Sequence, residues 1–457
     1  MSIDDAIAEL ESAEEHRRQA AVRTLIGAGR QAIPAMLRGL RESDSTSTAD
    51  ACARVLTGLG PLAYRPLVEL LAGMRAEPGA AAIAARLESR LCRLLGLATL
   101  DQAIEYSEGI RVGAEYSPRY RVACDIGDNG RTEYGFVLAA LLDDEEDNVR
   151  KAAARSFAAL GTDVAPLLRR IRRSPLPARH MALQALAEIG WHTLDSEDLR
   201  LLHRFVTSES AREAPLNPVV MKSLWWALPT GDQGAVLEAF GLSDPVPATI
   251  AMGRAVAKRN GSINELDFER VYVSAALDGW TLVFGDPTSH IPRDEQRIRE
   301  YLDDEFTRGL FELHCDDMKE RVLERVARPS IDERCAELSS QFGAAHYYKN
   351  SDAYDWGGWC IAENGEILRR AYRGDDLCDL DLEGDPHPSE QGLELESVGV
   401  SRIADSASVG PRSLGPDSRV TGHGVLALTA RGREVGGHRG SLPLTLTAYA
   451  PSIRPLG

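Results

Sequence analysis

A cysteine next to a histidine is the feature of this chain that most resembles a catalytic group. His314, Cys315, Asp316 and Asp317 follow one another in the segment FELHCDDMKERV. A thiol activated by an imidazole is a common nucleophile, but the two side chains must then face each other. Neighbours on a helix point about 100 degrees apart. We therefore expect a partly buried cysteine beside a solvated acidic face, and we assign no catalytic residue.

Aromatic and charged residues on two strand-like segments form the candidate partner-binding site. Aromatic and arginine side chains often dominate the energy of protein interfaces, and the two segments are expected to pair across a turn. The candidate residues are His346, Tyr347, Tyr348, Trp356, Trp359, Arg369 and Tyr372. The alternative is ordinary sheet core, because aromatic and β-branched residues also fill pleated surfaces.

Two charged clusters raise the question of which partners the chain could bind. The acidic cluster, in RGDDLCDLDLEGDPHP, consists of Asp375, Asp376, Asp379, Asp381, Glu383 and Asp385. It lacks the residue order of a calcium loop, so we expect a solvated acidic loop whose partner would be basic. The basic cluster consists of Arg169, Arg170, Arg172, Arg173 and Arg179. Because the net charge of the chain is -17, nucleic acid is disfavoured as a partner.

Motifs for cofactors, metals and disulfides are missing from the sequence. It contains no GxxxxGK[ST] loop and no GxGxxG between a strand and a helix, the common nucleotide-binding motifs. It also contains no HExxH and no CxxC, so a zinc site of either kind is not expected. The 7 cysteines are scattered and odd in number, which favours reduced thiols. We expect no cofactor and no metal, and whether the chain is an enzyme stays open.

Repeats in the first half of the chain predict the scaffold that would position any site. The segments RRQAAVRTLIGAGRQAIPAMLRGL, ADACARVLTGLGPLAYRPLVELL and VRKAAARSFAALGTDVAPLLRRI each read as helix, glycine, helix. The glycines are Gly29, Gly60, Gly96, Gly161 and Gly190. Their spacing of about thirty residues, or twice that, indicates stacked helical hairpins. Glycine directly after an apolar stripe also suits the left-handed end of a helix.

The repeats resemble HEAT repeats over about half of the chain. The pattern VRxxA…LxxxG…A…L is formed by Val149, Arg150, Ala153, Leu160, Gly161, Ala165 and Leu168. The resemblance implies an α-helical solenoid, which we place at residues 1–242. Residues 101–131 fit the pattern poorly, because they are polar and rich in tyrosine. They could form a distorted repeat with a long loop, and a loop on a rigid scaffold is a reasonable place for binding. We favour the alternative, a merely degenerate repeat.

The second half of the chain predicts an α+β domain. VYVSAAL and WTLVF, separated by DG, are typical of a hairpin. AAHYYK, WGGWCIAENGEILRRAY and VLALTA are typical of strands, with ENG as a turn within the second of them. EQRIREYLDDEF and IDERCAELSSQFG are typical of helices. We divide the chain into the solenoid, a linker at 243–262, the α+β domain at 263–430 and a flexible tail at 431–457. The predicted fold class is therefore multidomain, an all-α HEAT-like solenoid followed by an α+β domain.

A second resemblance lies within the α+β domain. RVYVSAALDGWTLVFG, AELSSQFGAAHYY, WCIAENGEILRRAY and IADSASVGPRSLG resemble a module of bacterial proteins of unassigned role, some of them similar to immunity proteins. The resemblance implies no catalytic residue. It does imply that the domain could bind or neutralise another protein.

Charge and hydropathy complete the functional prediction. From Gly261 onward there are 21 basic and 35 acidic residues, against 31 and 34 before it. The N-terminus is acidic where a signal peptide is basic, and no long apolar stretch could span a bilayer, so we expect a cytoplasmic protein without membrane contact. The leading hypothesis is a protein interaction scaffold, of immunity or regulatory type, whose acidic C-terminal domain binds a basic protein.

The alternative hypothesis is a HEAT-like enzyme that acts on DNA, as a glycosylase does, or on a small natural product. Trp191, Trp225 and Trp226 would then be candidates for a substrate platform. We favour the other interpretation of these residues, as solenoid core and end-capping aromatics. A cluster of tryptophan, aspartate and arginine on the inner face of the solenoid would favour the enzyme.

Overall fold

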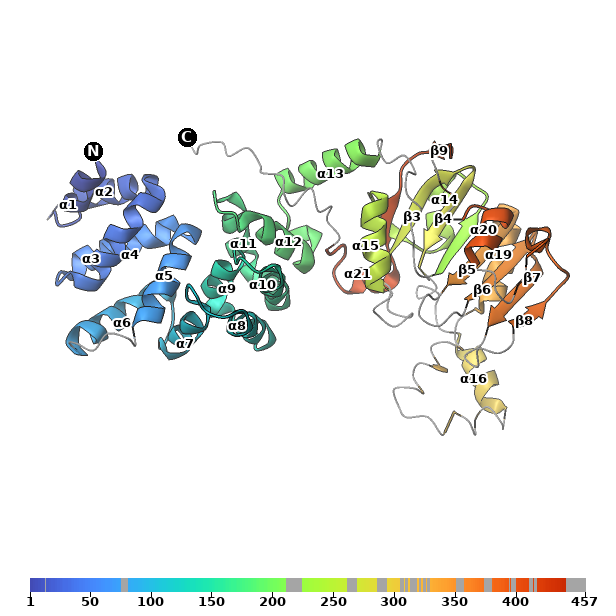
Figure 1. Ribbon diagram of the computed structural model, residues 1–457, viewed down its shortest axis with the longest axis horizontal. Coiled ribbons are helices and arrows are strands. Elements are labelled where there is room, and N and C mark those ends of the chain that lie inside the picture. Colours follow the sequence, from blue (N-terminus) through green and yellow to red (C-terminus); the bar gives the residue numbers. More distant parts are fainter. Residues whose placement is uncertain are drawn as a thin grey trace. The chain divides into compact units, whose positions relative to one another are not determined.

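The computed structural model contains two compact units, Met1–Ser196 and Glu197–Pro443. Apart from scattered single positions, the described residues are 1–12, 14–74, 81–210, 224–260, 269–285, 294–304, 329–350, 357–373, 380–393, 400–410 and 417–440. The described part of the first unit is helical, and the second unit is built on an antiparallel sheet with helices (Figure 1). The predicted fold class is confirmed. None of the described helices has the length and apolar character needed to cross a bilayer.

Helices of the first unit pack in two rows. They are α1 (Ile3–Glu9), α2 (Glu15–Gly27), α3 (Ile33–Glu42), α4 (Thr46–Leu59), α5 (Pro61–Gly73), α6 (Ala81–Leu95), α7 (Asp101–Ile110), α8 (Tyr116–Asp128), α9 (Gly135–Leu141), α10 (Asp147–Leu160), α11 (Ala165–Arg173) and α12 (Arg179–Ile189). In one row α2 contacts α4, and α8 and α12 contact α10. In the other row α3 and α9 both contact α5. Each helix can bury one apolar stripe against its neighbours, because stripe residues recur every three or four positions.

The segment at 101–131 is helical, unlike the long loop considered from its sequence. Helices α7 and α8 are joined by a short connection, and α7 packs on α5. Tyr106 lies edge-on to Tyr134, with ring centroids 5.2 Å apart, and its hydroxyl donates to the carboxylate of Asp125. Tyr106, one of the tyrosines that obscured the helical pattern, is thus used in packing, whereas Tyr116 is 42% exposed.

Glycine allows a close approach between two repeats at the junction of α4 and α5. Gly60 has a φ of 53 degrees, a region that side chains disfavour. The guanidinium of Arg170 donates to the carbonyl of Thr57, 3.2 Å away. A Cβ at position 60 would lie 2.3 Å from Nη2 of Arg170. The predicted need for glycine at a helix end is confirmed here. The close approach of Arg170 is a second reason why position 60 requires glycine.

An antiparallel sheet of ten strands in the described residues forms the second unit. The strands are β1 (Leu224–Leu228), β2 (Ser243–Pro247), β3 (Arg270–Leu277), β4 (Trp280–Phe284), β5 (Ala344–Asn350), β6 (Gly357–Glu363), β7 (Glu366–Arg373), β8 (Leu380–Glu383), β9 (Val420–Thr421) and β10 (Val425–Leu428). Their order is β2-β10-β3-β4-β1-β5-β6-β7-β8, and β9 also pairs with β3. The turns of the two predicted hairpins are confirmed, since Asp278, Gly279, Asn364 and Gly365 all have positive φ.

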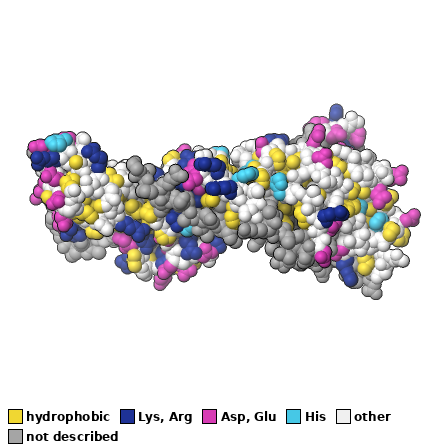
Figure 2. All heavy atoms as spheres, turned by 90° about the horizontal axis from the view of Figure 1, so that it is seen from above, with side chains coloured by type: hydrophobic (Ala, Val, Ile, Leu, Met, Phe, Trp, Pro, Cys, Tyr) yellow, Lys and Arg dark blue, Asp and Glu magenta, His cyan; other side chains and the backbone are white. Residues whose placement is uncertain are grey.

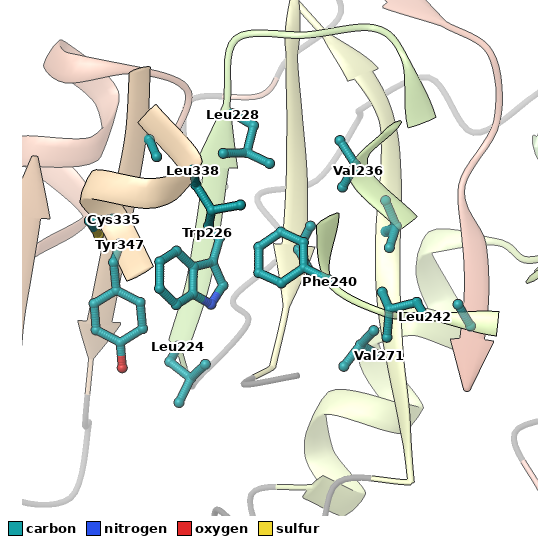
Figure 3. Packing of buried hydrophobic residues seen from close by; sticks show 14 of the residues in the cluster. Leu224, Trp226, Leu228, Val236, Phe240, Leu242, Val271, Cys335, Leu338 and Tyr347 are labelled. Carbon is teal, nitrogen blue, oxygen red and sulfur yellow. The ribbon is translucent and has the colours of Figure 1, made fainter. Parts of the chain in front are cut away.

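Helices cover both faces of this sheet. The bounds of those helices are α14 (Gln233–Ala239), α15 (Ile250–Asn260), α19 (Ile331–Phe342) and α20 (Val400–Ala407). On one face Trp226 and Tyr347 pack with Phe240, which follows α14, and with Leu338 of α19 (Figure 3). On the other face α15 packs on β3, and α20 packs on β5 and β6. The sheet is therefore the middle layer of three.

The second unit begins earlier in the chain than the sequence analysis placed it. Strand β1 lies in the middle of the sheet, between β4 and β5, and β2 forms one edge. Both had been assigned to residues before the α+β domain, β1 to the solenoid and β2 to the linker. After β10, helix α21 (Ala430–Glu434) and residues up to 440 are described as well, and Arg439 forms an ion pair with Glu269. Part of the predicted tail is thus packed on this unit, and 441–457 lie outside the described residues.

Replacing Ser330 by alanine tests the start of α19. Its hydroxyl accepts from the backbone N–H of Glu333, and the Glu333 carboxylate accepts from the N–H of Ser330, 2.6 Å away. Loss of this reciprocal cap should lower the free energy of unfolding by about 1 kcal/mol. Urea unfolding followed by tryptophan fluorescence measures it, because five of the six tryptophans belong to the second unit. Ser340→Ala on the same helix is the control, and an equal loss there would contradict the capping role.

Candidate functional site

Four of the predicted partner-binding residues share one face of the sheet. Tyr348 pairs with Trp359, and His346 pairs with Ile361, which pairs in turn with Arg369. Paired residues of an antiparallel sheet point to the same side, and alternate residues of a strand do too. His346, Tyr348, Trp359 and Arg369 are all buried, with 0–5% of their surfaces exposed.

The remaining predicted residues lie elsewhere. Tyr347 points to the opposite face, into the core shared with Trp226. Tyr372 also belongs to that opposite face and is 45% exposed. Trp356 lies outside the described residues. The sequence analysis therefore named residues of both faces, and their role in partner binding stays a prediction.

A buried polar chain runs from β5 to the end of α20. Nδ1 of His346 lies 3.1 Å from the hydroxyl of Tyr348, which lies 3.0 Å from Oγ of Ser408. The Trp280 and Trp225 rings pack on His346 and Tyr348, with centroids 5.0 and 5.2 Å apart. Burial, and to a smaller extent nearby His387, lowers the pKa of His346 to about 4. The imidazole is therefore neutral at neutral pH and acts as a hydrogen-bonding group within the core.

A buried ion pair lies farther along the same face. The guanidinium Nε of Arg369 lies 2.8 Å from Oε1 of Glu390, and the indole N–H of Trp359 donates to the same oxygen over 3.2 Å. Arg369 also donates to the carbonyl of Gly384 over 2.7 Å. Glu390 belongs to the short helix η6 (Pro388–Glu390), which this carboxylate fixes against the sheet. Both charged side chains are buried, so the pair is part of the structure and not a charged surface.

Three carboxylates surround one arginine at the edge of the opposite face. Arg370 lies 2.7 Å from Asp332 of α19, 2.8 Å from Glu383 and 3.6 Å from Asp381. The hydrogen bond to Asp332 raises the pKa of Arg370. The side chains of Asp381 and Glu383 remain 67% and 61% exposed. This acidic edge, defined as Asp332, Asp381 and Glu383, therefore carries more negative charge than Arg370 compensates.

Strand β8 ends the sheet on that side. Within the described residues it pairs with β7 alone, so the backbone groups of its outer edge have no strand partner. Leu382 on this strand is 40% exposed. Only Asp381, Glu383 and Asp385 of the acidic run in the sequence are described, and the first two belong to β8. The remaining acidic residues of the run, at 375, 376 and 379, lie outside the described part.

The chain matches no protein-family model, no curated protein and no solved structure. Its function is therefore inferred from contacts, burial and charge.

The arginine cluster of the sequence is largely engaged within the first unit. Arg169 donates to the carbonyl of Thr193 over 2.8 Å, and Arg173 pairs with Asp195. Arg172 is 1% exposed. On the face of the molecule seen in Figure 2, acidic and basic side chains are interspersed, without a broad field of one sign. A nucleic-acid interface would present a continuous basic surface.

The tryptophans considered for a substrate platform are all buried. Trp225 and Trp226 belong to β1 and point to opposite faces of the sheet, and Trp191 is 8% exposed in the first unit. The segment His314–Asp317 lies entirely outside the described residues, so its chemistry stays a prediction. Among the described residues no three histidine, cysteine, aspartate or glutamate side chains are grouped to hold a metal ion.

Sequence reasoning missed several residues that complete these clusters. Glu390 and Ser408 reach the sheet from distant segments, and the sequence analysis gave neither of them a role. Arg370 follows Arg369 directly, yet it points to the opposite face and binds different acids. The alternation of β7 could have separated these two arginines, because successive strand residues point to opposite faces.

Proposed function

We propose that the chain is a protein interaction scaffold whose second unit binds a basic partner at the acidic edge beside β8. The observation that carries the proposal is the set of three carboxylates around the single guanidinium of Arg370. A partner with lysine or arginine side chains would neutralise the excess charge. Most of the exposed carboxylate surface lies on β8, where the open strand edge offers hydrogen bonds to an added strand.

The mode of binding follows from the edge strand. A partner strand that pairs with β8 would place alternate side chains beside Asp381 and Glu383, which share one face. Its intervening side chains would meet Leu382 on the other face. Such a contact combines backbone hydrogen bonds with charge pairing, so its affinity should fall as ionic strength rises.

The first unit supports the scaffold part of the proposal. Its two rows of helices, its positive-φ glycines and its repeated sequence pattern resemble those of HEAT repeats, and stacks of that kind provide extended binding surfaces. We propose an immunity or regulatory type of action, in which binding at the acidic edge blocks a basic surface of the partner. A cytoplasmic location is part of the same proposal.

Reversing the charge of the acidic edge tests this function. The full chain and its Asp381→Lys/Glu383→Lys variant are titrated with a labelled peptide of alternating lysine and valine, and with a matched glutamate and valine peptide. We expect the basic peptide to bind the unchanged chain, and the variant to bind it about tenfold or more weakly, a loss of about 1.4 kcal/mol or more.

The control variant has the same change in net charge at a different place. Glu238→Lys/Glu434→Lys alters exposed residues of α14 and α21, and these elements contact β3 and β10 and not β8. It should bind the basic peptide as the unchanged chain does, apart from a small general effect of charge. Equal losses in both variants, or preference for the acidic peptide, would contradict a specific basic partner at β8.

A further inference from the structure

A hollow in the first unit lies apart from the acidic edge. Its volume is about 860 Å³, within the range of ligand-binding sites. Side chains from α3, α5 and α9 line it, together with residues that precede α12. These helices are neighbours in one row of the stack, since α5 contacts both α3 and α9. The hollow is therefore formed within the first unit by successive repeats.

Most of the lining is apolar. Leu62, Pro66 and Leu70 of α5 are spaced by four residues and form one stripe along that helix. Across from them α9 contributes Ala139 and Ala140, whose short side chains leave the space unfilled. An apolar hollow that neighbouring helices leave open is suited to the apolar side of a ligand, whose burial there removes it from water.

The charged groups at the hollow favour a negatively charged ligand. The lining carboxylates already have partners, since Glu69 lies 3.4 Å from Arg65 and accepts the N–H of Val112 over 3.2 Å. Burial raises the pKa of Asp143, and the nearby guanidinium groups of Arg30 and Arg65 oppose this shift. The side chain of Arg30 is exposed at the hollow, where it can also reach a ligand.

A further arginine borders the same place. Arg170 is not part of the lining, but its Nη2 lies 2.3 Å from where a Cβ of Gly60 would stand, directly before the lining residue Pro61. Its one hydrogen bond in the described part goes to the carbonyl of Thr57, which leaves its positive charge unpaired.

With Arg170 at its border, the hollow has three guanidinium groups, of Arg30, Arg65 and Arg170, against the two carboxylates of Glu69 and Asp143. The excess positive charge favours a ligand with carboxylates.

We propose that this hollow binds an acidic amphipathic segment of a partner protein. Its apolar side chains would pack on the stripe of α5, and its carboxylates would pair with Arg30 and Arg170. Three neighbouring helices span about 20 Å at the usual helix spacing, which matches a peptide segment better than a compact small molecule. Amphipathic helices that lie in grooves between helices are a recurring mode of recognition. The site is independent of the basic partner proposed for the sheet.

Fluorescence anisotropy of two labelled peptides tests the proposal on the full chain. The first is an amphipathic peptide of leucine and glutamate, and the second has lysine in place of every glutamate. We expect the acidic peptide to bind about tenfold or more tightly than the basic one, and Arg30→Glu to weaken it about tenfold. Leu70→Trp, which fills the hollow, should weaken the acidic peptide as well.

The control is Arg23→Glu, which makes the same charge change at an exposed residue of α2 in the other row. It should leave binding of the acidic peptide unchanged, and circular dichroism should show that both arginine variants melt as the unchanged chain does. Equal binding of the two peptides, equal effects of the two variants, or no peptide binding would overturn the proposal. Binding of dodecanoate without binding of the peptide would also overturn it, in favour of a small apolar acid.

Discussion

Arg369→Met should lower the free energy of unfolding of the second unit by about 3–5 kcal/mol, because it leaves the carboxylate of Glu390 buried without its cation. Only the indole N–H of Trp359 would then donate to that carboxylate, among the contacts described above. The side chains of Arg369 and Glu390 are 6% and 4% exposed, so water cannot replace the lost partner. Urea unfolding followed by tryptophan fluorescence measures the change.

Two further variants show whether the loss comes from the unpaired charge. Arg369→Met combined with Glu390→Leu removes both charges, and it should recover most of the stability lost in the single variant. Arg431→Ala breaks an ion pair with Glu434 whose partners are 50% and 66% exposed, so it should cost less than about 1 kcal/mol. A double variant no more stable than Arg369→Met would mean that packing and hydrogen bonds, and not the charge, determine the effect.

The parts of the fold that sequence could predict are those set by neighbours along the chain. Glycine after an apolar helical stripe indicated the helix ends, and the Asp-Gly and Asn-Gly pairs indicated two tight turns with positive φ. The segment at 101–131 shows the limit of the repeat pattern. There the apolar pattern is interrupted by polar residues and by tyrosines, of which Tyr106 packs against Tyr134, so the helical pair fitted the repeat pattern poorly.

Strand β1 could not be recognised from the sequence, because it too lacks a periodic pattern. Its five residues, LWWAL, are all buried because helices cover both faces of the sheet, so the run shows no alternation of polar and apolar residues. A short continuous apolar run fits a buried strand and a buried helix equally well. Its neighbours β4 and β5 follow later in the chain, and only that long-range pairing shows that it is the central strand. The domain boundary was displaced accordingly.

The candidate site also consists of residues that could be predicted from the sequence and of residues that could not. The two aromatic strands were predicted, and pairing of β5 with β6 and of β6 with β7 brings His346, Tyr348, Trp359 and Arg369 to one face. Their partners come from η6 and α20, and Ser408 lies 60 residues from Tyr348. No local pattern links such residues. The sequence could therefore suggest which strands matter, whereas the burial of these side chains depends on segments that return to the sheet.

Acidification should destabilise the second unit through His346. Burial lowers its pKa from an ordinary value of 6.5 to about 4, so between these values the unfolded chain binds a proton that the folded chain does not. Stability therefore falls as pH falls through this window. The contribution of this group amounts to about 2 kcal/mol between pH 7 and pH 5, and to about 3 kcal/mol by pH 4.

Comparison with His346→Gln isolates this contribution, because the neutral amide does not titrate and other groups affect both chains alike. Urea unfolding at pH 7, 6 and 5, followed by tryptophan fluorescence, should show a loss about 2 kcal/mol smaller for the variant over that range. His203→Gln, at an exposed histidine of α13 (Ser196–Ser210), should retain the full pH dependence of the unchanged chain. If His346→Gln also retained it, protonation of the folded state would not be opposed at this site. Such a result would contradict the lowered pKa, which follows from the burial of His346 against the Trp280 ring.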